Sequence, residues 1–263
     1  MPRYLLSLEV DGSRFSGTQI QGKGERTVQG ELGELLAPLG ITTIRPGSRL
    51  DQGVSAACLP VEVLTTRDWA PAILGLAINQ RLPADLVVLR VAPVSESFDV
   101  RHAAHKTYRY RVVSRPVRPV LDRACWWVRD LIHPELLTPL AALLPGKRDL
   151  SGFAALRHDQ TDDQDPLRHY FAAWWESSRN GDDSVHHFRI TGEGFLYRQV
   201  RGLVGAMVLV AIGRATIAEF TAAIAAGRAA KRLGNIAPAA GLLLEQVSYQ
   251  PEPAWTTVSV ANR

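Results

Sequence analysis

The sequence predicts an α+β protein with two ferredoxin-like halves that share a central, mainly antiparallel sheet. Residues 3–10 alternate apolar and polar side chains, as a half-buried strand does. Residues 1–104 order their segments as strand, helix, strand, strand, helix, strand, which is the ferredoxin-like order. Residues 105–250 repeat this character more loosely, without a repeat at the level of sequence identity. We therefore predict two halves with these bounds and a tail over 251–263.

The N-terminal half opens with the strand over 3–10, which Asp11-Gly12-Ser13 ends. Thr27 is a predicted N-cap, because the apolar residues after it recur on one helical stripe. Gly40 follows this stripe and is expected to stop the helix. The rest of this half is predicted to be a strand over 41–44, a strand over 54–64, a helix over 71–79 and a strand over 86–91.

The C-terminal half shows the same kinds of signal. Thr216 and Glu219 have the spacing of a capping box that opens a helix. The apolar stripe over 200–211 predicts the helix before it, with Gly213 as its stop. The other predicted elements are a strand over 107–113, a helix over 136–144 and strands over 170–175, 185–190 and 240–247. The predicted loops are 157–165 and 179–184, and the tail is expected to be loosely ordered.

The charge composition favours a polyanionic partner. Among 263 residues, 30 are lysine or arginine and 26 are aspartate or glutamate, so the net charge is +4. Arginine far outnumbers lysine, and its planar fork suits bidentate phosphate contacts. Arginine-rich chains are also common in GC-rich genomes, so composition alone leaves the partner open.

Cysteine use and hydropathy predict a cytoplasmic protein. Cys58 and Cys125 are isolated thiols with apolar neighbours, which gives neither a disulfide framework nor a zinc site. The N-terminus enters a strand directly and has no apolar signal-peptide region. The apolar stretch over 205–212 is too short to span a bilayer. We therefore expect no membrane contact.

The segment 45–55 is the most reactive-looking part of the chain. It places two arginines and one carboxylate in a glycine-containing loop between two apolar segments. By turn chemistry alone, Asp51 is a solvated turn residue. Because Arg49 lies two residues away, the carboxylate of Asp51 can instead be held ionised and act as a nucleophile.

Two further groups of side chains are candidates for binding. Tyr108 and Tyr110 share one face of a strand, where one could stack on a splayed-out base or both could face the core. Arg201 opens an apolar helix just after Phe195-Leu196-Tyr197. This arginine is either a rim residue or a residue aimed into a cleft.

Several classes of site are not encoded. The seven histidines show no paired metal spacing, and the adjacent His186 and His187 point to opposite faces of a strand. The glycines match neither the Walker pattern nor the dinucleotide-binding pattern, and no Gly-x-Ser-x-Gly elbow is present. We therefore expect an enzyme that uses one aspartate and needs neither a cofactor nor a metal.

Several motifs follow one another along almost the whole chain, from about Tyr4 to Tyr249. They are Asp11-Gly12-Ser13-Arg14-Phe15-Ser16-Gly17, Thr27-Val28-Gln29-Gly30-Glu31-Leu32, Arg49-Leu50-Asp51-Gln52-Gly53-Val54, Asn79-Gln80-Arg81-Leu82-Pro83, Phe98-Asp99-Val100-Arg101, Lys106-Thr107-Tyr108-Arg109-Tyr110, Gly194-Phe195-Leu196-Tyr197-Arg198-Gln199-Val200-Arg201 and Ala240-Gly241-Leu242-Leu243-Leu244. In this order they resemble the segments of the TruA-type tRNA pseudouridine synthases. Each motif alone is weak, whereas the ordered set is specific.

The resemblance implies the pseudouridine synthase fold with a cleft between the two halves. It implies a tRNA pseudouridine synthase, an isomerase that acts on uridines 38 to 40 in the anticodon stem-loop. Asp51 would be the nucleophile, with Arg49 beside it and Tyr108 stacked on the base. Attack on the sugar, attack on the ring and removal of the 2′ proton all stay open as its first step. The implied substrate-binding residues are Tyr108, Leu242, Arg201 and Phe195.

The resemblance also implies a homodimer in which one tRNA contacts both subunits, without a cofactor. Five residues depart from the family pattern: Thr18, Ser48, Leu50, Ser55 and Arg198 replace tryptophan, glycine, threonine, histidine and histidine. A catalytically degenerate RNA-binding paralogue with the same fold is therefore an alternative. A small-molecule enzyme or a structural α+β domain whose motifs match by chance is a third interpretation.

Overall fold

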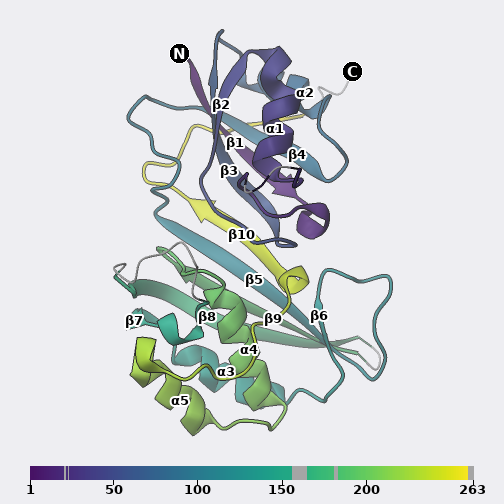
Figure 1. Ribbon diagram of the computed structural model, residues 1–263, viewed down its shortest axis with the longest axis vertical. Helices are drawn as coiled ribbons and strands as arrows, with labels where there is room; N and C mark the ends of the chain where they lie inside the picture. The colour runs from purple at the N-terminus through teal and green to yellow at the C-terminus, as the bar shows by residue number, and fades with distance from the viewer. Residues whose placement is uncertain (21, 23, 156–164, 181–182, 260–263) are drawn as a thin grey trace. The chain divides into compact units, whose positions relative to one another are not determined.

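The computed structural model describes residues 1–20, 22, 24–155, 165–180 and 183–259. The chain forms two compact units (Figure 1). Unit 1 comprises residues 1–104 and 243–263, and unit 2 comprises residues 105–242. Residues 243–250, which we assigned to the C-terminal half, therefore pack with the N-terminal residues.

Unit 1 has the predicted ferredoxin-like order. Its elements are β1 (Arg3–Val10), η1 (Gly12–Arg14), α1 (Val28–Leu36), η2 (Ala37–Leu39), β2 (Ile41–Pro46), β3 (Ser55–Thr65), α2 (Pro71–Asn79), β4 (Leu86–Pro93), β10 (Leu242–Ser248) and β11 (Thr256–Thr257). Its strands lie in the order β11-β4-β1-β3-β10, and β2 pairs with β3 along a different stretch. The β3–β10 pair is parallel, whereas β1, β2, β4 and β11 pair antiparallel.

Local signals fix the ends of these elements as predicted. The Thr27 hydroxyl accepts the Gly30 N–H at 3.2 Å and caps α1. The Asp11 carboxylate accepts the Ser13 N–H at 3.0 Å, which turns the chain away from β1. Gly40 has φ of 79°, in the left-handed region, where the helical segment ends.

The C-terminal segment covers part of the unit 1 sheet. Leu5, Val100 and Tyr249 form a buried apolar cluster, and the Tyr249 hydroxyl donates to the Val100 carbonyl at 2.7 Å. Further along, Thr256 of β11 pairs with β4, and the Arg90 guanidinium stacks 4.7 Å above the Trp255 ring. The expectation of a loosely ordered tail was therefore wrong for residues 251–259. These residues pair with β4 and pack against distant residues, and neither contact can be read from the local sequence pattern.

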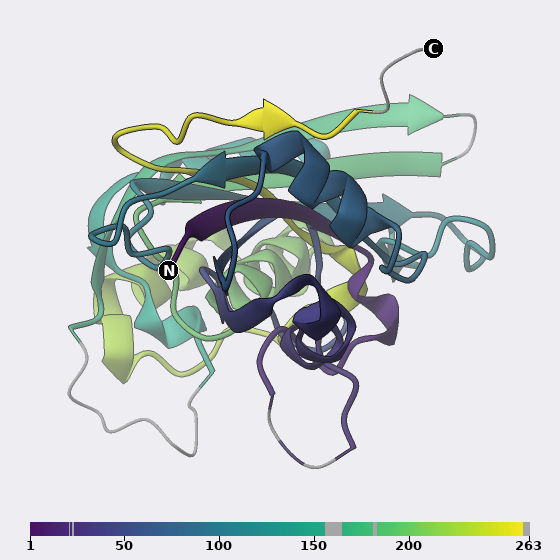
Figure 2. The same cartoon turned by 90° about the horizontal axis from the view of Figure 1, so that it is seen from above.

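Unit 2 is also α+β. Its elements are β5 (His105–Ser114), β6 (Trp126–Val128), α3 (Pro134–Ala142), β7 (Gly146–Asp149), η3 (Ser151–Phe153), β8 (Leu167–Asn180), β9 (Asp183–Gly192), α4 (Gln199–Ala211), α5 (Ile217–Ala226), η4 (Gly227–Ala229) and η5 (Ala239–Gly241). The strands β5, β9, β8 and β7 are antiparallel neighbours, and β6 pairs parallel with β5. In Figure 2 the green helices α4 and α5 lie on one side of β8 and β9.

The interior of unit 2 is packed tightly around α4. The Trp175 indole N–H of β8 donates to the Met207 sulfur of α4 at 3.4 Å. A Cβ atom on Gly202 of α4 would lie 1.8 Å from the Phe153 carbonyl oxygen, so only glycine permits this approach. His186 is 1% exposed and its Nδ1 lies 2.8 Å from the Ser177 hydroxyl. Burial lowers the pKa of His186 to about 4, so the imidazole is neutral at neutral pH.

The predicted elements of unit 2 are present, with one clear correction. The capping box of α5 is confirmed, since Thr216 and Glu219 cap each other's backbone N–H groups. The prediction of a loop over 179–184 was wrong at both ends, because β8 continues to Asn180 and β9 begins at Asp183. Cross-strand pairing extends both strands through polar residues. The loop over 157–165 lies almost wholly outside the described residues.

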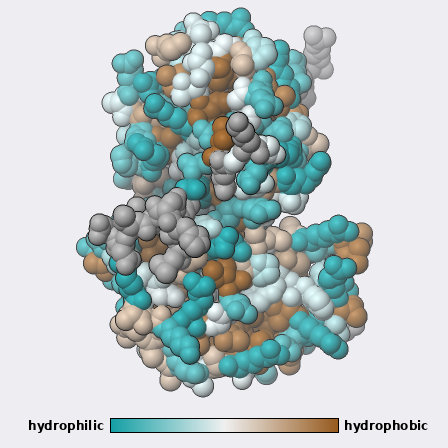
Figure 3. Space-filling model, viewed as in Figure 1, coloured by the Kyte–Doolittle hydropathy of each residue, from teal (hydrophilic) through white to brown (hydrophobic). Residues whose placement is uncertain are grey.

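A helix that crosses a bilayer must be long and apolar. In the described part of the chain, every helix is too short or too polar to cross one. On the face seen in Figure 3, hydrophilic and apolar residues are interspersed over both units.

Candidate active site

The Asp51 loop, residues 47–54, joins β2 to β3 in unit 1 and is held by the opening turn of the chain. The Thr18 N–H donates to the Leu50 carbonyl at 3.2 Å, and the Thr18 hydroxyl accepts the Leu50 N–H at 2.8 Å. The Leu50 side chain is 5% exposed. Two hydrogen bonds and burial therefore fix the residue between Arg49 and Asp51.

Close backbone approach fixes the other end of the loop. Gly53 has φ of 78°, which favours glycine, and its N–H donates to the Phe15 carbonyl at 3.2 Å. A Cβ atom on Gly12 would lie 1.9 Å from the Val54 carbonyl oxygen. The Ser55 hydroxyl accepts the Gly12 N–H at 3.0 Å. The loop therefore needs glycine at both positions and a small acceptor at position 55.

Three of the five departures from the family pattern belong to this support. Thr18 and Ser55 supply its side-chain hydrogen bonds, and Leu50 supplies its buried apolar contact. Ser48 is also buried, and its hydroxyl has no hydrogen-bond partner among the described residues. These changes alter what holds the loop and leave Arg49 and Asp51 in place.

Arg49 and Asp51 differ in exposure. The Arg49 side chain is exposed, whereas Asp51 is half-buried. The Asp51 carbonyl accepts the Val54 N–H at 3.1 Å and closes a tight turn. The loop therefore presents an accessible guanidinium two residues from a carboxylate on a fixed backbone.

Tyr108 and Tyr110 of β5 have different surroundings. Tyr110 is fully buried and its hydroxyl donates to the Pro238 carbonyl at 2.6 Å, while burial raises its pKa. Tyr108 is 8% exposed and meets the Phe195 ring edge-on, with centroids 5.1 Å apart. Tyr110 is thus a core residue, and Tyr108 with Phe195 forms an aromatic pair close to the surface of unit 2.

Arg201 lies in the first turn of α4 and is half-buried. Its Nε donates to the Ala237 carbonyl at 2.8 Å, which holds the side chain along the segment before η5. Arg198 precedes the helix with φ of 57°, an uncommon value for a residue other than glycine, and its guanidinium stacks 4.8 Å from the Tyr197 ring centroid.

Leu242 is 7% exposed and begins β10 directly after η5. The preceding Gly241 lies against the Tyr110 ring, where a Cβ atom would come within 2.6 Å of Cε1. The close contact with β5 positions the residue before Leu242 and leaves no room for a larger side chain.

The predicted site residues are divided between the two units. Unit 1 brings Arg49 and Asp51 together on one loop. Unit 2 brings Tyr108 and Phe195 into contact and carries the remaining two, Arg201 and Leu242. Within the described ranges, no cluster of three or more His, Cys, Asp or Glu residues could hold a metal ion.

Sequence reasoning missed one charged residue of unit 1. Glu62 lies in the middle of β3 and is 1% exposed, yet its carboxylate pairs with Arg3 at 2.9 Å. The available signal was a single carboxylate between Val61 and Val63 in an apolar strand. A charge in such a position is buried and therefore needs a partner or a ligand.

Comparison with known proteins identifies the family. A family model described as tRNA pseudouridine synthase matches residues 140–250. The tRNA pseudouridine synthase A of Allorhizobium ampelinum is 34% identical over 98% of this chain and 99% of its own length. The proteins of that name from Methylobacterium sp. (strain 4-46) and Moorella thermoacetica are 36% and 33% identical, over 96% and 95% of this chain and 99% and 100% of theirs.

These matches place the chain among the pseudouridine synthases, as the ordered motifs predicted. It belongs to the tRNA pseudouridine synthase A family. Among solved structures, one chain from a crystal structure of a Cbf5-Nop10-Gar1 complex is 12% identical, with a TM-score of 0.38. The match covers 94% of this chain and 50% of the matched chain. That similarity is too low to add to the assignment.

Proposed function

We propose that this protein isomerises uridine to pseudouridine in tRNA, with Asp51 as the nucleophile. The observation that carries the proposal is the similarity to tRNA pseudouridine synthases A over nearly the full length of the chain. The fixed backbone of the Asp51 loop supports the residue assignment, because a misplacement of about 1 Å can cost on the order of a hundredfold in rate.

The reaction is balanced without an outside reagent. The C1′–N1 bond of the uridine breaks and a C1′–C5 bond forms, while C5 loses a proton to solvent and N1 gains one. Electrons are redistributed within the nucleotide and no water is added. A carboxylate that starts the cleavage must be ionised. The loop places the Arg49 guanidinium two residues away from it in sequence.

The target base has to leave the stack before a protein carboxylate can reach it. In the proposed roles, the exposed Arg49 contacts a phosphate and helps to hold the flipped nucleotide. Tyr108, supported by Phe195, provides the stacking face and Leu242 provides an apolar wall. Arg201 contacts a phosphate of the substrate. These roles follow the family resemblance residue by residue.

The proposed substrate site is the anticodon stem-loop at positions 38 to 40, and the proposed assembly is a homodimer. Family membership supports both. Two exposed aromatic residues of β8, Phe171 and Trp174, are 48% and 37% exposed, and a second subunit could cover them.

The test is tritium release from tRNA labelled at C5 of uridine, with wild type beside Asp51→Ala and Asp51→Asn. Wild type should release tritium, and both variants should lose release while retaining tRNA binding. If Asp51→Ala releases tritium at the wild-type rate, Asp51 is not the nucleophile. Tight tRNA binding without release by wild type would favour the catalytically degenerate RNA-binding paralogue.

A further inference from the structure

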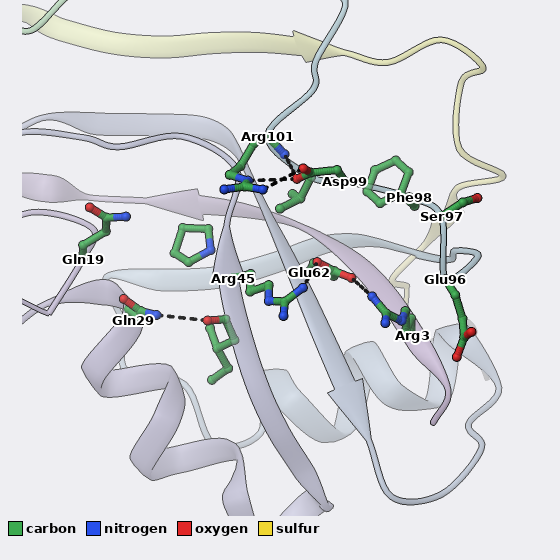
Figure 4. A pocket seen from close by; sticks show the side chains of 13 residues that line it. Arg3, Gln19, Gln29, Arg45, Glu62, Glu96, Ser97, Phe98, Asp99 and Arg101 are labelled. Carbon is green, nitrogen blue, oxygen red and sulfur yellow. Dashed lines mark hydrogen bonds and ion pairs between the residues drawn. The ribbon is translucent and has the colours of Figure 1, made fainter.

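A pocket in unit 1 is lined by residues other than those assigned above. Its volume is about 610 Å³, within the range of small-molecule sites. Its lining combines three arginines, three carboxylates, two glutamines and an aromatic ring (Figure 4). The residues that matter here are Arg3, Arg45, Glu62, Phe98, Arg101 and Gln19.

Glu62 forms the floor of this pocket. Arg3 donates to Glu62 Oε1 at 2.9 Å, which compensates the buried charge. Arg45 approaches the other oxygen, Oε2, only to 3.8 Å, which is beyond hydrogen-bond distance. Figure 4 shows Arg3 and Arg45 on opposite sides of this carboxylate. Glu62 Oε2 is therefore a buried acceptor that faces the pocket and has spare capacity for a donor.

The mouth of the pocket carries charges of both signs. The side chains of Arg45 and Arg101 are 59% and 76% exposed. Arg101 forms two hydrogen bonds with Asp99, at 3.1 and 2.8 Å, and these hold the guanidinium at the rim. The ring of Phe98 lines the same space and packs against Tyr249. A ligand here meets the Arg45 guanidinium and the Arg101–Asp99 pair at the rim, an aromatic wall and an acceptor at the floor.

The pocket is lined by residues adjacent in sequence to the Asp51 loop and to Thr18. The lining residue Pro46 leads directly into Gly47, whose N–H donates to the Pro60 carbonyl at 2.8 Å. A Cβ atom on Gly47 would lie 2.5 Å from the carbonyl oxygen of Val100, another lining residue. On the opposite side, Gln19 follows Thr18, which holds Leu50. The pocket and the Asp51 loop are therefore connected through Pro46–Gly47 and through Gln19–Thr18.

We propose that this pocket binds an unpaired nucleotide of the RNA substrate, separate from the target uridine. Glu62 accepts from an N–H on the base edge, such as guanine N1 or uracil N3. Arg45 and Arg101 contact the phosphate of that nucleotide, and Phe98 contacts the base or sugar. A bare phosphate fits less well, because the floor of the pocket is a carboxylate. This inference rests on the proposed RNA substrate.

The test pairs protein variants with RNA variants. An anticodon stem-loop RNA is made with an abasic residue at each unpaired position in turn. One position other than the target should lower affinity for wild type on the order of tenfold, because it removes a charge-assisted hydrogen bond. The same abasic RNA should bind Glu62→Gln and Phe98→Leu with nearly the affinity of the intact RNA, because the base contact is already lost. Arg45→Ala should weaken the binding of both RNAs by the same factor, because the abasic nucleotide keeps its phosphate.

Arg67→Ala is the matched control, since Arg67 is exposed, belongs to unit 1 and stacks on Trp69 outside the pocket. Its response to abasic RNA should equal that of wild type. Phe98 is half-buried, so Phe98→Leu keeps the test valid if Glu62→Gln does not fold. If wild type binds RNA and releases tritium, but no abasic position affects wild type and Glu62→Gln differently, the proposed nucleotide binding by the pocket is wrong and the proposed function is unaffected. If wild type releases no tritium, the proposed function is contradicted. An RNA position whose abasic form weakens binding to wild type but not to Glu62→Gln would still support the pocket.

Discussion

At the scale of single residues, Thr18 shows how an altered loop keeps its geometry. Its side chain is fully buried, and its hydroxyl satisfies the Leu50 N–H next to Asp51. A buried N–H without an acceptor costs about 1–3 kcal/mol. Thr18 is therefore a positioning residue that acts on Asp51 through the backbone of Leu50.

Replacing Thr18 tests this role. Thr18→Val keeps the shape and removes the hydroxyl, so we expect a loss of about 1–3 kcal/mol in unfolding free energy. The rate of tritium release should fall as well. Thr18→Ser keeps the hydroxyl, so it should retain turnover while losing about 1 kcal/mol for the buried methyl group. Urea denaturation and initial rates measure the two effects. Equal turnover in the two variants would show that the hydrogen bond does not position the loop.

The residues of this region were predictable to different degrees. Arg49 and Asp51 lie in one loop whose composition identified them without any structure. Glu62 gave only a weak signal, because its partners Arg3 and Arg45 are far from it in sequence and meet it only through strand pairing. A local pattern shows that a charge is buried but does not show what it meets.

At the scale of elements, α4 is shaped by glycine. The helix carries Arg201 in its first turn, and Gly202 and Gly205 let neighbouring backbone approach it. A Cβ atom on Gly205 would lie 1.9 Å from the Asn235 carbonyl oxygen. The helix can therefore pack directly against η3 and against the segment after α5. In α1, by contrast, Gly33 is exposed, and a Cβ atom added there would have no neighbour within 4 Å among the described residues.

Two helical glycines should therefore respond to alanine with opposite signs. Gly33→Ala should stabilise the protein by about 0.5–1 kcal/mol, because alanine loses less conformational entropy on helix formation. Gly202→Ala should destabilise it by about 3 kcal/mol or more, because its Cβ overlaps a carbonyl oxygen that cannot move freely. Urea midpoints of the two variants against wild type give the comparison. A neutral Gly202→Ala would mean that α4 can shift away from η3.

Elements with their own signals were predicted well. The α2 helix has the predicted bounds, and the Thr27 and Thr216 caps begin their helices where expected. The strands β6, β7 and β11 were missed, since they contain three, four and two residues. Such short strands exist because a longer strand pairs with them, and their own sequences contain too few residues for a period to show.

At the scale of the whole molecule, unit 1 is built from both ends of the described chain. Residues 243–259 return to it after unit 2 and add β11 to the edge of β4. Val258 also donates its N–H to the Leu89 carbonyl at 2.9 Å. The sequence-based boundary after residue 104 matches the division of the chain, whereas the return of the C-terminal segment depends on pairing between residues more than 150 positions apart.

Truncation tests the contribution of this segment. A chain ending at Gln250 lacks Trp255 and β11, so unit 1 should lose about 1–3 kcal/mol and expose the edge of β4. Urea denaturation and size-exclusion chromatography should show lower stability and more self-association. A chain ending at residue 259 keeps β11 and is the control. Identical behaviour of the two truncated chains would show that β11 does not protect the edge.

The returning segment has a consequence for biosynthesis. Residues 1–104 leave the ribosome early. Their sheet is completed only by strands that are translated after all of unit 2. Unit 2 is continuous in sequence and can complete its own pairing first. The nascent N-terminal portion must therefore remain unfinished, with the faces later covered by residues 243–259 open to chaperones, throughout the synthesis of unit 2.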